Sequence, residues 1–372
     1  MKNIKVYLQY PWKFPDSPYY KYLINSPPEK IEYLNTKKQK GVITNKSKFL
    51  FFNLLKKFIR NSITSFRLSF PNAHLSPGGN YDLIHCAHCL SKNKKKLWIS
   101  DFESEWQLYV GEKNNYSKRK VRKFLTSKQC KKILPWTEHT KKEIISQFPE
   151  IKNKIEVVFP AIPLQKLNKK KNKKIKILYA TRYFWLKGGI IALEVYGKIK
   201  KKFQDKVELV FISDVPEEIK KNYPELEIRD LVSQKELFEE YSTSDLFFYP
   251  SFMDTFGFGL LEAMSFGLPI ISVNTSRTKT RHEIIQDEKQ GFVLEVGKNL
   301  TQKVLNQKGD LKIGEEEKEL IEKLFQKTSE LIKNKKLKEK MSKNCIKLIK
   351  GGKFSIKERN EKLKRVYEEA IK

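Results

Sequence analysis

Cysteine is scarce in this sequence, with four residues among 372. So few thiols build no disulfide framework and suit a reducing compartment such as the cytoplasm. Long apolar runs are also missing, because no window of about 18 apolar residues exists to span a bilayer. Near the N-terminus, Pro11 and neighbouring charges interrupt any signal-peptide core. We therefore expect a cytoplasmic protein that is soluble or peripheral on the cytoplasmic face of a membrane.

Acidic residues are outnumbered, because 75 Lys and Arg stand against 43 Asp and Glu and give a net charge of +32. Such a surface attracts polyanions, which include nucleic acid, anionic lipid and phosphorylated substrates. The basic residues are spread along the chain, which favours a solvated lysine-rich surface. No nucleic-acid module is recognisable, and aromatic residues do not alternate with basic ones as in a stacking platform. We expect no nucleic-acid partner.

Apolar residues make up 39% of the chain, enough for packed cores, and 372 residues suit two domains. Short apolar runs alternate with helical patterns, an order typical of an α/β fold with parallel sheets covered on both faces. Strands are expected at Ile4–Gln9, Leu83–Cys86, Lys96–Ser100, Lys131–Pro135, Ile155–Phe159, Ile175–Ala180, Glu208–Ile212, Leu246–Tyr249 and Pro269–Val273. Helices are expected at Lys48–Asn61, Thr140–Phe148, Gly189–Phe203, Ser233–Ser242, Gly259–Phe266, Glu315–Asn334 and Ile356–Ile371.

A polar, lysine-rich stretch runs from Pro163 to Lys174, and a new strand pattern starts directly after it. We interpret this stretch as an interdomain linker, with a solvated loop inside one large domain as the alternative. The expected divisions of the chain are 1–164, 165–350 and the C-terminal segment 351–372.

The first segment with recognisable chemistry is Ile175–Gly189. A strand ends there at Ala180, a loop carries Arg182 and Lys187, and a glycine pair beginning at Gly188 opens a helix. Ligands of open α/β sheets bind at the carboxyl ends of strands, where a helix N-terminus offers free N–H groups to an anion. Two cations on that loop are suited to gripping a diphosphate, although such loop cations also occur without this role.

The second segment, Asp245–Val273, runs from a buried strand through a loop into a helix. Gly257 and Gly259 allow the loop backbone to approach a ligand closely. Asp254 precedes the helix, and Glu262 is expected in its first turn. Carboxylates there can accept hydrogen bonds from sugar or ribose hydroxyls. The simpler interpretation of Glu262 is a favourable interaction with the helix dipole.

A third segment, Arg281–Leu294, is expected to form a short helix and a turn at Gly291. Together the three segments resemble glycosyltransferase family 4, the group 1 glycosyltransferases with the GT-B fold. That family has an Arg and a Lys-Gly after one strand, a Pro-Ser, a Phe-Gly inside a Glu-x7-Glu box, a Leu-Glu-Ala-Met and a Gly-x-Pro. The matching residues here are Arg182, Lys187–Gly188, Pro250–Ser251, Phe256–Gly257, Leu260–Met264 and Gly267–Pro269.

The resemblance implies two Rossmann-like domains facing across a cleft, an acceptor domain and then a donor-nucleotide domain, with the helix of segment 351–372 crossing back onto the first. It implies a retaining enzyme that moves a sugar from a nucleotide-diphosphate sugar to a polysaccharide, lipid-linked or other hydroxyl acceptor. The catalytic roles fall to Arg182, Lys187 and Asp254: the cations bind the diphosphate, and Asp254 stands where the family usually has a Glu near the donor sugar. Donor binding falls to Gly188, Phe256, Gly257, Phe258, Gly259, Leu260, Leu261 and Glu262. No metal or cofactor is expected to be required.

Other site candidates come from places where the sequence departs from the family. Glu283 matches a family Glu before a glycine turn, although Thr275–Arg277 replace the Gly-Gly upstream. In the first domain Phe102 stands where the family often has a His, and the flanking Asp101 and Glu103 become candidate donor-side carboxylates. A helix cap or an exposed acidic loop is the plainer interpretation of those two residues.

Two further motifs have more than one interpretation. His85–Cys89 reads HCAHC, which is compatible with a zinc or redox site. A buried loop is favoured because no second cysteine pair exists, and His85 or His88 is a candidate for lining the acceptor cleft. Lys48–Arg60 is basic and apolar, so it suits either an amphipathic helix on an anionic membrane surface or a core-facing helix.

Two other functional classes stay open: a catalytically silent GT-B-like binding or scaffold protein, which the departure at Asp254 favours, and a nucleic-acid-binding protein. The sequence specifies neither the nucleotide base, the sugar and the acceptor nor the oligomeric state.

Overall fold

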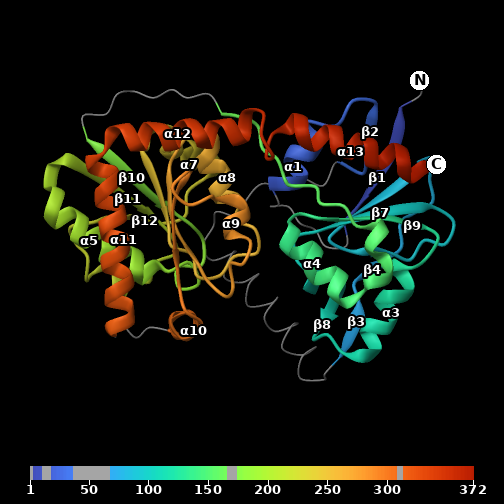
Figure 1. Ribbon diagram of the computed structural model, residues 1–372, viewed down its shortest axis with the longest axis horizontal. Helices are drawn as coiled ribbons and strands as arrows, with labels where there is room; N and C mark the ends of the chain where they lie inside the picture. The colour runs from blue at the N-terminus through green and yellow to red at the C-terminus, as the bar shows by residue number, and fades with distance from the viewer. Residues whose placement is uncertain (1–2, 11–17, 37–67, 166–173, 308–312) are drawn as a thin grey trace. The chain divides into compact units, whose positions relative to one another are not determined.

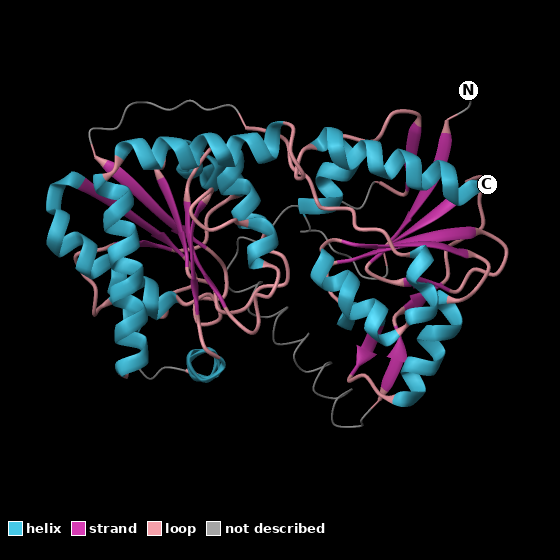
Figure 2. Cartoon of the chain, viewed as in Figure 1, coloured by secondary structure: helices cyan, strands magenta, loops and turns pink. Residues whose placement is uncertain are grey.

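The computed structural model describes residues 3–10, 18–36, 68–165, 174–307 and 313–372. The chain divides into two compact units, which are Met1–Ala161 with Lys353–Lys372, and Ile162–Gly352. Each unit is a sheet flanked by helices (Figures 1 and 2). The predicted Lys48–Arg60 segment lies outside the described residues. None of the helices within them is long and apolar enough to cross a membrane.

The main sheet of the first unit is parallel throughout, with strand order β2-β1-β5-β7-β9. Its strands are β1 (Ile4–Gln9), β2 (Ile31–Leu34), β5 (Leu83–Ala87), β7 (Leu97–Phe102) and β9 (Cys130–Pro135). Every residue of the central strand β5 is buried, as expected where helices cover both faces. Two short pairs accompany the sheet: β3 (Ser69–Pro71) with β8 (Tyr109–Gly111), and β4 (Ala73–His74) with β6 (Leu90–Ser91).

The C-terminal helix of the chain belongs to the first unit. The helices of this unit are α1 (Pro18–Asn25), α3 (Asn115–Leu125), α4 (Glu138–Gln147) and α13 (Ile356–Ile371), with 3-10 turns at Glu105–Leu108 and Pro149–Lys154. Helix α13 packs against β5, β7 and β9 (Figure 1). Arg359 Nη2 donates to the Ser26 carbonyl at 2.7 Å, and the hydroxyls of Tyr367 and Tyr33 lie 2.9 Å apart. The expected return of this helix onto the first unit is confirmed.

The predicted strand Ile155–Phe159 is wrong. Only a single bridge joins Ile155 to Ile133, although the Glu156 and Val158 amides donate to the Ile133 and Pro135 carbonyls. In a parallel ladder, the residue of β9 between these two bonds would donate its N–H to the Glu156 carbonyl. That residue is Pro135, which has no N–H. The segment therefore runs beside β9 without forming a strand.

The second unit has a six-stranded parallel sheet with the order β12-β11-β10-β13-β14-β15. Its strands are β10 (Ile175–Ala180), β11 (Val207–Ile212), β12 (Glu227–Arg229), β13 (Leu246–Tyr249), β14 (Ile270–Asn274) and β15 (Gly291–Glu295). Its helices are α5 (Gly189–Phe203), α6 (Glu217–Lys220), α7 (Gln234–Thr243), α8 (Phe258–Ser265), α9 (Arg281–Ile284), α10 (Lys298–Asn306), α11 (Glu315–Lys333) and α12 (Lys335–Lys350), with a 3-10 turn at Gln204–Lys206. Both units are thus Rossmann-like, which confirms the predicted fold class.

The chain reverses direction across the second sheet between β10 and β13. From β10 it moves outward through β11 and β12, and it then returns to pair β13 with the other edge of β10, in register Ile177 to Leu246. Such a reversal creates a crevice outside the carboxyl ends of the two strands, where ligands of open α/β sheets bind. The loops that follow β10 and β13 flank this switch point.

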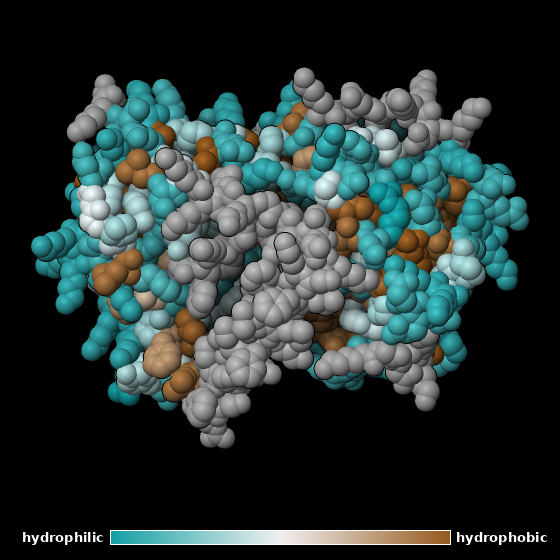
Figure 3. Space-filling model, turned by 180° about the vertical axis from the view of Figure 1, so that it is seen from behind, coloured by the Kyte–Doolittle hydropathy of each residue, from teal (hydrophilic) through white to brown (hydrophobic). Residues whose placement is uncertain are grey.

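The surface of the described residues is mainly hydrophilic on the face shown in Figure 3, with separate hydrophobic patches. The most exposed large apolar side chains among these residues are Leu75, at 72%, and Trp106, at 55%.

Candidate functional site

The loop after β10 enters helix α5 through a glycine that no other residue can replace without strain. Gly188, the N-cap of α5, has φ +70°, which is left-handed backbone. A Cβ there would lie 2.3 Å from the carbonyl oxygen of Pro250, at the start of the loop after β13. The two loops therefore touch backbone to backbone, which brings the residues that they carry to one place.

Replacing Gly188 by Ala is expected to lower the free energy of unfolding by about 2–4 kcal/mol, because the left-handed backbone and the clash with Pro250 both oppose a side chain. Urea unfolding followed by circular dichroism measures the loss. The matched control is Gly197→Ala within the same helix, where the nearest atom would lie 3.8 Å from the new Cβ. That variant should gain about 0.5–1 kcal/mol. Equal stabilities of the two variants would contradict the expectation.

Lys187 links the two loops through its side chain. Its Nζ donates to the Met253 carbonyl at 2.8 Å and lies 3.3 Å from Asp254 Oδ1. The Tyr249 hydroxyl, at the end of β13, donates to Asp254 Oδ2 at 2.8 Å. Sequence reasoning brought Lys187 and Asp254 together and missed Tyr249.

Arg281, the first residue of α9, is a further cation at this site that sequence reasoning missed. Its side chain is 1% exposed, and its Nη2 lies 3.6 Å from Asp254 Oδ2. Its guanidinium carbon stands 5.4 Å from the centre of the Tyr249 ring, within cation–π range. One sequence pattern indicates this burial. Arg281 precedes Ile284 and Ile285 by three and four residues, the spacing of one helix face, and both isoleucines are fully buried.

These charges stabilise one another. Burial alone would raise the pKa of Asp254, but Lys187, Arg281 and the Tyr249 hydroxyl together hold it below its usual value. Burial also opposes the ammonium of Lys187, and the nearby carboxylate outweighs it and raises the pKa of Lys187. Both groups are therefore ionised at neutral pH.

Helix α8 begins at this site. Gly257 precedes it with φ +99°, so the chain turns sharply from the loop into the helix. The Leu260 amide already donates to the Gly257 carbonyl, whereas the Gly259 amide lies in the first turn, where the helix itself supplies no acceptor. An anion at this helix terminus would be stabilised by that N–H group.

The remaining predicted donor-site residues of this unit have differing exposure. The side chains of Phe256, Leu260 and Leu261 are buried in the core, at 1% exposure or less, so only their backbone is available to a ligand. Glu262 is also buried, at 8%, and is the fifth residue of α8. The expectation that it lies in the first turn is wrong, because the helix starts one residue earlier than predicted.

Two further candidates belong to the second unit, one on the loop after β10 and one in α9. Arg182 is half-buried and follows β10 by two residues, and Glu283 is half-buried in α9. The short helix predicted in this third segment is confirmed as α9. The predicted turn at Gly291 is displaced, since residues 288–290 form the turn and Gly291 starts β15.

The candidates of the first unit form an internal network. Asp101 is fully buried in β7, so the expectation that it lies on a loop is wrong. Its carboxylate accepts hydrogen bonds from the Tyr20 hydroxyl at 2.6 Å, from His85 Nε2 at 3.1 Å and from the His88 amide at 3.3 Å. His85 is fully buried too, and its Nδ1 lies 2.7 Å from the Tyr367 hydroxyl of α13. Neither side chain is open to a ligand in this structure.

The HCAHC motif forms the end of β5 and the turn after it. Cys86 and Cys89 are free, buried thiols, each 3.6 Å from Gln9 Nε2. Burial raises the pKa of Cys86, which disfavours the thiolate that metal binding and redox chemistry require. Within the part of the chain that the structure describes, no three His, Cys, Asp or Glu side chains could hold a metal ion together. Glu103, just after β7, is half-buried.

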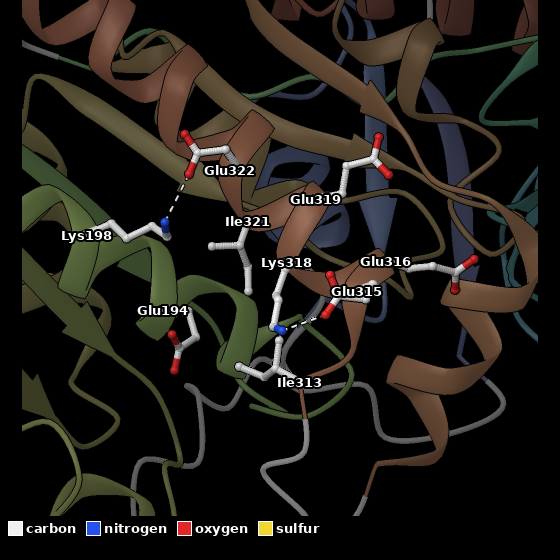
Figure 4. Close-up of a pocket in the computed structure, with 9 residues that line it drawn as sticks. All are labelled: Glu194, Lys198, Ile313, Glu315, Glu316, Lys318, Glu319, Ile321 and Glu322. Carbon is white, nitrogen blue, oxygen red and sulfur yellow. Dashed lines mark hydrogen bonds and ion pairs between the residues drawn. The ribbon is translucent and has the colours of Figure 1, made fainter.

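A cavity of about 690 Å³ lies between α5 and α11, and Figure 4 shows its lining. Both of its lysines form ion pairs with lining glutamates, Lys198 with Glu322 at 3.0 Å and Lys318 with Glu315 at 2.6 Å. None of its lining residues belongs to the loops after β10 and β13. The switch point, whose loops carry the predicted residues, therefore stays the candidate site.

Comparison with known proteins finds a family match in the second unit. Residues 163–307 match the family model described as glycosyl transferases group 1. An uncharacterized glycosyltransferase of Haemophilus influenzae is 29% identical over 184 residues, which are 48% of this chain and 51% of that protein. The chain thus spans about half the length of the curated relative that it matches.

Solved structures share the fold over the full length of the chain. A glycosyltransferase from Rickettsia africae superposes with a TM-score of 0.57 and 15% identity, covering 100% of this chain and 99% of that one. Anabaena HepE, solved in complex with UDP and glucose, gives a TM-score of 0.55 and 11% identity, covering 98% and 99%. Residues 163–307, which contain both loops of the candidate site, therefore match the group 1 glycosyltransferase family, and the chain shares the GT-B fold of the solved structures.

Proposed function

We propose that this chain transfers a sugar from a nucleotide-diphosphate sugar to a hydroxyl acceptor on a polysaccharide, a lipid-linked glycan or another molecule, with retention of anomeric configuration. The position of Lys187 is the observation that carries the proposal. Its ammonium lies at the switch point, bonded to the Met253 carbonyl and paired with Asp254. The complex of HepE with UDP and glucose supports a nucleotide sugar as the donor class.

The proposed chemistry is cleavage of a glycosyl–phosphate bond, in which negative charge develops on the departing diphosphate. Lys187 and Arg182 would stabilise that charge as fixed cations, and the Gly259 amide in the first turn of α8 would add a hydrogen bond. Such fixed groups need no metal ion to do so. Asp254 would face the donor sugar, and Glu262 would hold the ribose.

The proposed acceptor side rests on the family resemblance. A lipid-linked acceptor would suit a protein that lies on an anionic membrane surface through the basic Lys48–Arg60 segment. The net charge of +32 favours such contact.

A thermal-shift screen tests the donor proposal. UDP, GDP, ADP and their sugar derivatives are added at about 100 times the dissociation constant, where binding stabilises the folded protein by about 2.7 kcal/mol. We expect one base series to raise the melting temperature, and Arg182→Ala to reduce the increase. Lys198→Ala is the matched control, since Lys198 is 46% exposed on α5 and pairs with Glu322. No shift with any nucleotide would contradict the proposal.

The second candidate function is a catalytically silent binding protein, which the Asp in place of Glu at residue 254 favours. Both functions predict nucleotide binding. Release of the nucleoside diphosphate from the stabilising nucleotide sugar, measured with and without acceptor extract, separates them. Binding without transfer or donor hydrolysis would favour the silent protein.

A further inference from the structure

Arg281 is a buried cation whose hydrogen-bonding capacity is largely unused. Its Nε donates to the Val273 carbonyl at 3.3 Å. Its Nη1 and Nη2 are buried and have no hydrogen-bond partner among the described residues. A guanidinium that is 1% exposed is costly unless a charge compensates it. The carboxylate of Asp254, 3.6 Å from Nη2, is the group that compensates this charge.

Asp254 lies between two cations that approach different oxygens. Lys187 lies 3.3 Å from Oδ1, on the side of the loop after β10, and Arg281 lies 3.6 Å from Oδ2. Among the described residues, the Tyr249 hydroxyl is the third titratable group that faces this carboxylate. The Asp254 amide donates to the Arg277 carbonyl. The two cations and one carboxylate leave a net charge of +1, whereas Lys187 and Asp254 alone would leave none.

Gly257 leaves the space that this arrangement needs. A Cβ at that position would lie 3.0 Å from Asp254 Oδ2 and 3.2 Å from Arg281 Nη1. The carboxylate and the guanidinium thus fill the space that a side chain at residue 257 would need. Aspartate also has one methylene fewer than the Glu of the resembled family, which keeps its carboxylate close to the loop backbone and to Arg281.

We propose that Arg281 is a positioning residue that neutralises Asp254 from the buried side, so that the carboxylate stays fixed and the charge of Lys187 remains available to the donor diphosphate. This inference rests on the proposed function of the site. Without Arg281, Asp254 would be balanced by Lys187 alone. An arriving diphosphate would then have to compete with that carboxylate for the ammonium.

Two measurements on the full chain test the inference, and neither requires turnover. The first is the pKa of the Asp254 carboxyl by carbon-13 NMR, with Asp254→Asn identifying the signal. The second is the dissociation constant of inorganic pyrophosphate by calorimetry. The variants are Arg281→Met, Arg281→Lys, Asp254→Asn and the double variant Arg281→Met with Asp254→Asn. If Arg281→Met fails to fold, Arg281→Gln replaces it in both measurements.

We expect Arg281→Met to raise the pKa of Asp254 by about 1–3 units, because an opposite charge at this distance lowers a carboxyl pKa by that much. Pyrophosphate should bind about tenfold more weakly to this variant. Arg281→Lys retains the charge, so its Asp254 pKa and its affinity for pyrophosphate should both stay close to the wild-type values. In the Asp254→Asn background, Arg281→Met should change pyrophosphate binding by less than about threefold, because no carboxylate remains to withdraw Lys187.

Two outcomes would overturn the inference: an unchanged Asp254 pKa in Arg281→Met, or equal losses of pyrophosphate affinity with Asp and with Asn at residue 254. The second would mean that Arg281 acts on the ligand or on the fold directly. Failure of the proposed function looks different. The wild-type protein would then bind neither pyrophosphate nor any nucleotide, while the Asp254 pKa still depended on Arg281.

Discussion

Replacing Lys187 by Ala is expected to lower turnover by about 10²–10³-fold with the donor saturating, the loss found when a single fixed group that stabilises developing charge is removed. The ammonium lies where the loops after β10 and β13 meet, and it is held there by the Met253 carbonyl and Asp254. Because it is already oriented, it can stabilise a departing diphosphate without reorganising. Release of nucleoside diphosphate from the donor found by the thermal-shift screen measures the effect.

The control for this prediction is Lys198→Ala, which removes an equal charge from the same unit. Lys198 is about half exposed and pairs with Glu322 on the surface, so its loss should leave turnover within about twofold. A lower turnover with an unchanged Michaelis constant would assign Lys187 to the transition state. Near-wild-type transfer by Lys187→Ala would exclude the proposed role.

The candidate site could be predicted from sequence because its chemistry sits at strand ends. Arg182 and Lys187 follow the strand Ile175–Ala180, and Asp254 follows Leu246–Tyr249; both strands read as buried and parallel from their apolar runs. Parallel strands align their carboxyl ends at one sheet edge. Local patterns therefore placed these loops on the same edge, although the strands are about 70 residues apart in the sequence.

The features that could not be predicted from the sequence depend on partners far along the chain. Burial of Arg281 is tolerated because Asp254, 27 residues earlier, provides a compensating charge, and no local pattern specifies that pairing. Asp101 was expected on a loop because the predicted strand Lys96–Ser100 ends just before it. Its hydrogen-bond donors come from Tyr20 and His85, on α1 and β5, so the strand continues through it.

Replacing Asp101 by Ala is expected to lower the free energy of unfolding of the first unit by about 3–5 kcal/mol. The fully buried carboxylate accepts hydrogen bonds from the Tyr20 hydroxyl, His85 Nε2 and the His88 amide, all of which would lose their acceptor inside the core. In a unit of this size such a loss lowers the melting temperature by roughly 10 °C. Differential scanning calorimetry measures it.

The control for this variant is Asp205→Ala. Its side chain is 94% exposed and its ion pair with Lys174 spans 3.9 Å, so its loss should change stability by less than about 0.5 kcal/mol. If Asp101→Ala and this control had the same melting temperature, the Asp101 network would contribute nothing measurable to the stability of the first unit.

The pH dependence of the Asp101 effect follows from its partners. Burial alone would raise the pKa of Asp101, but the hydrogen bond and charge of His85, with His88 and Tyr20, hold it below its usual 3.8. A carboxyl whose folded pKa is lowered stabilises the protein above its unfolded pKa, and that contribution is lost as the pH falls through the folded value. The stability difference between wild type and Asp101→Ala should therefore be full at pH 5–7 and shrink below about pH 4. A difference that grew as the pH fell from 5 to 3 would contradict the lowered pKa of Asp101.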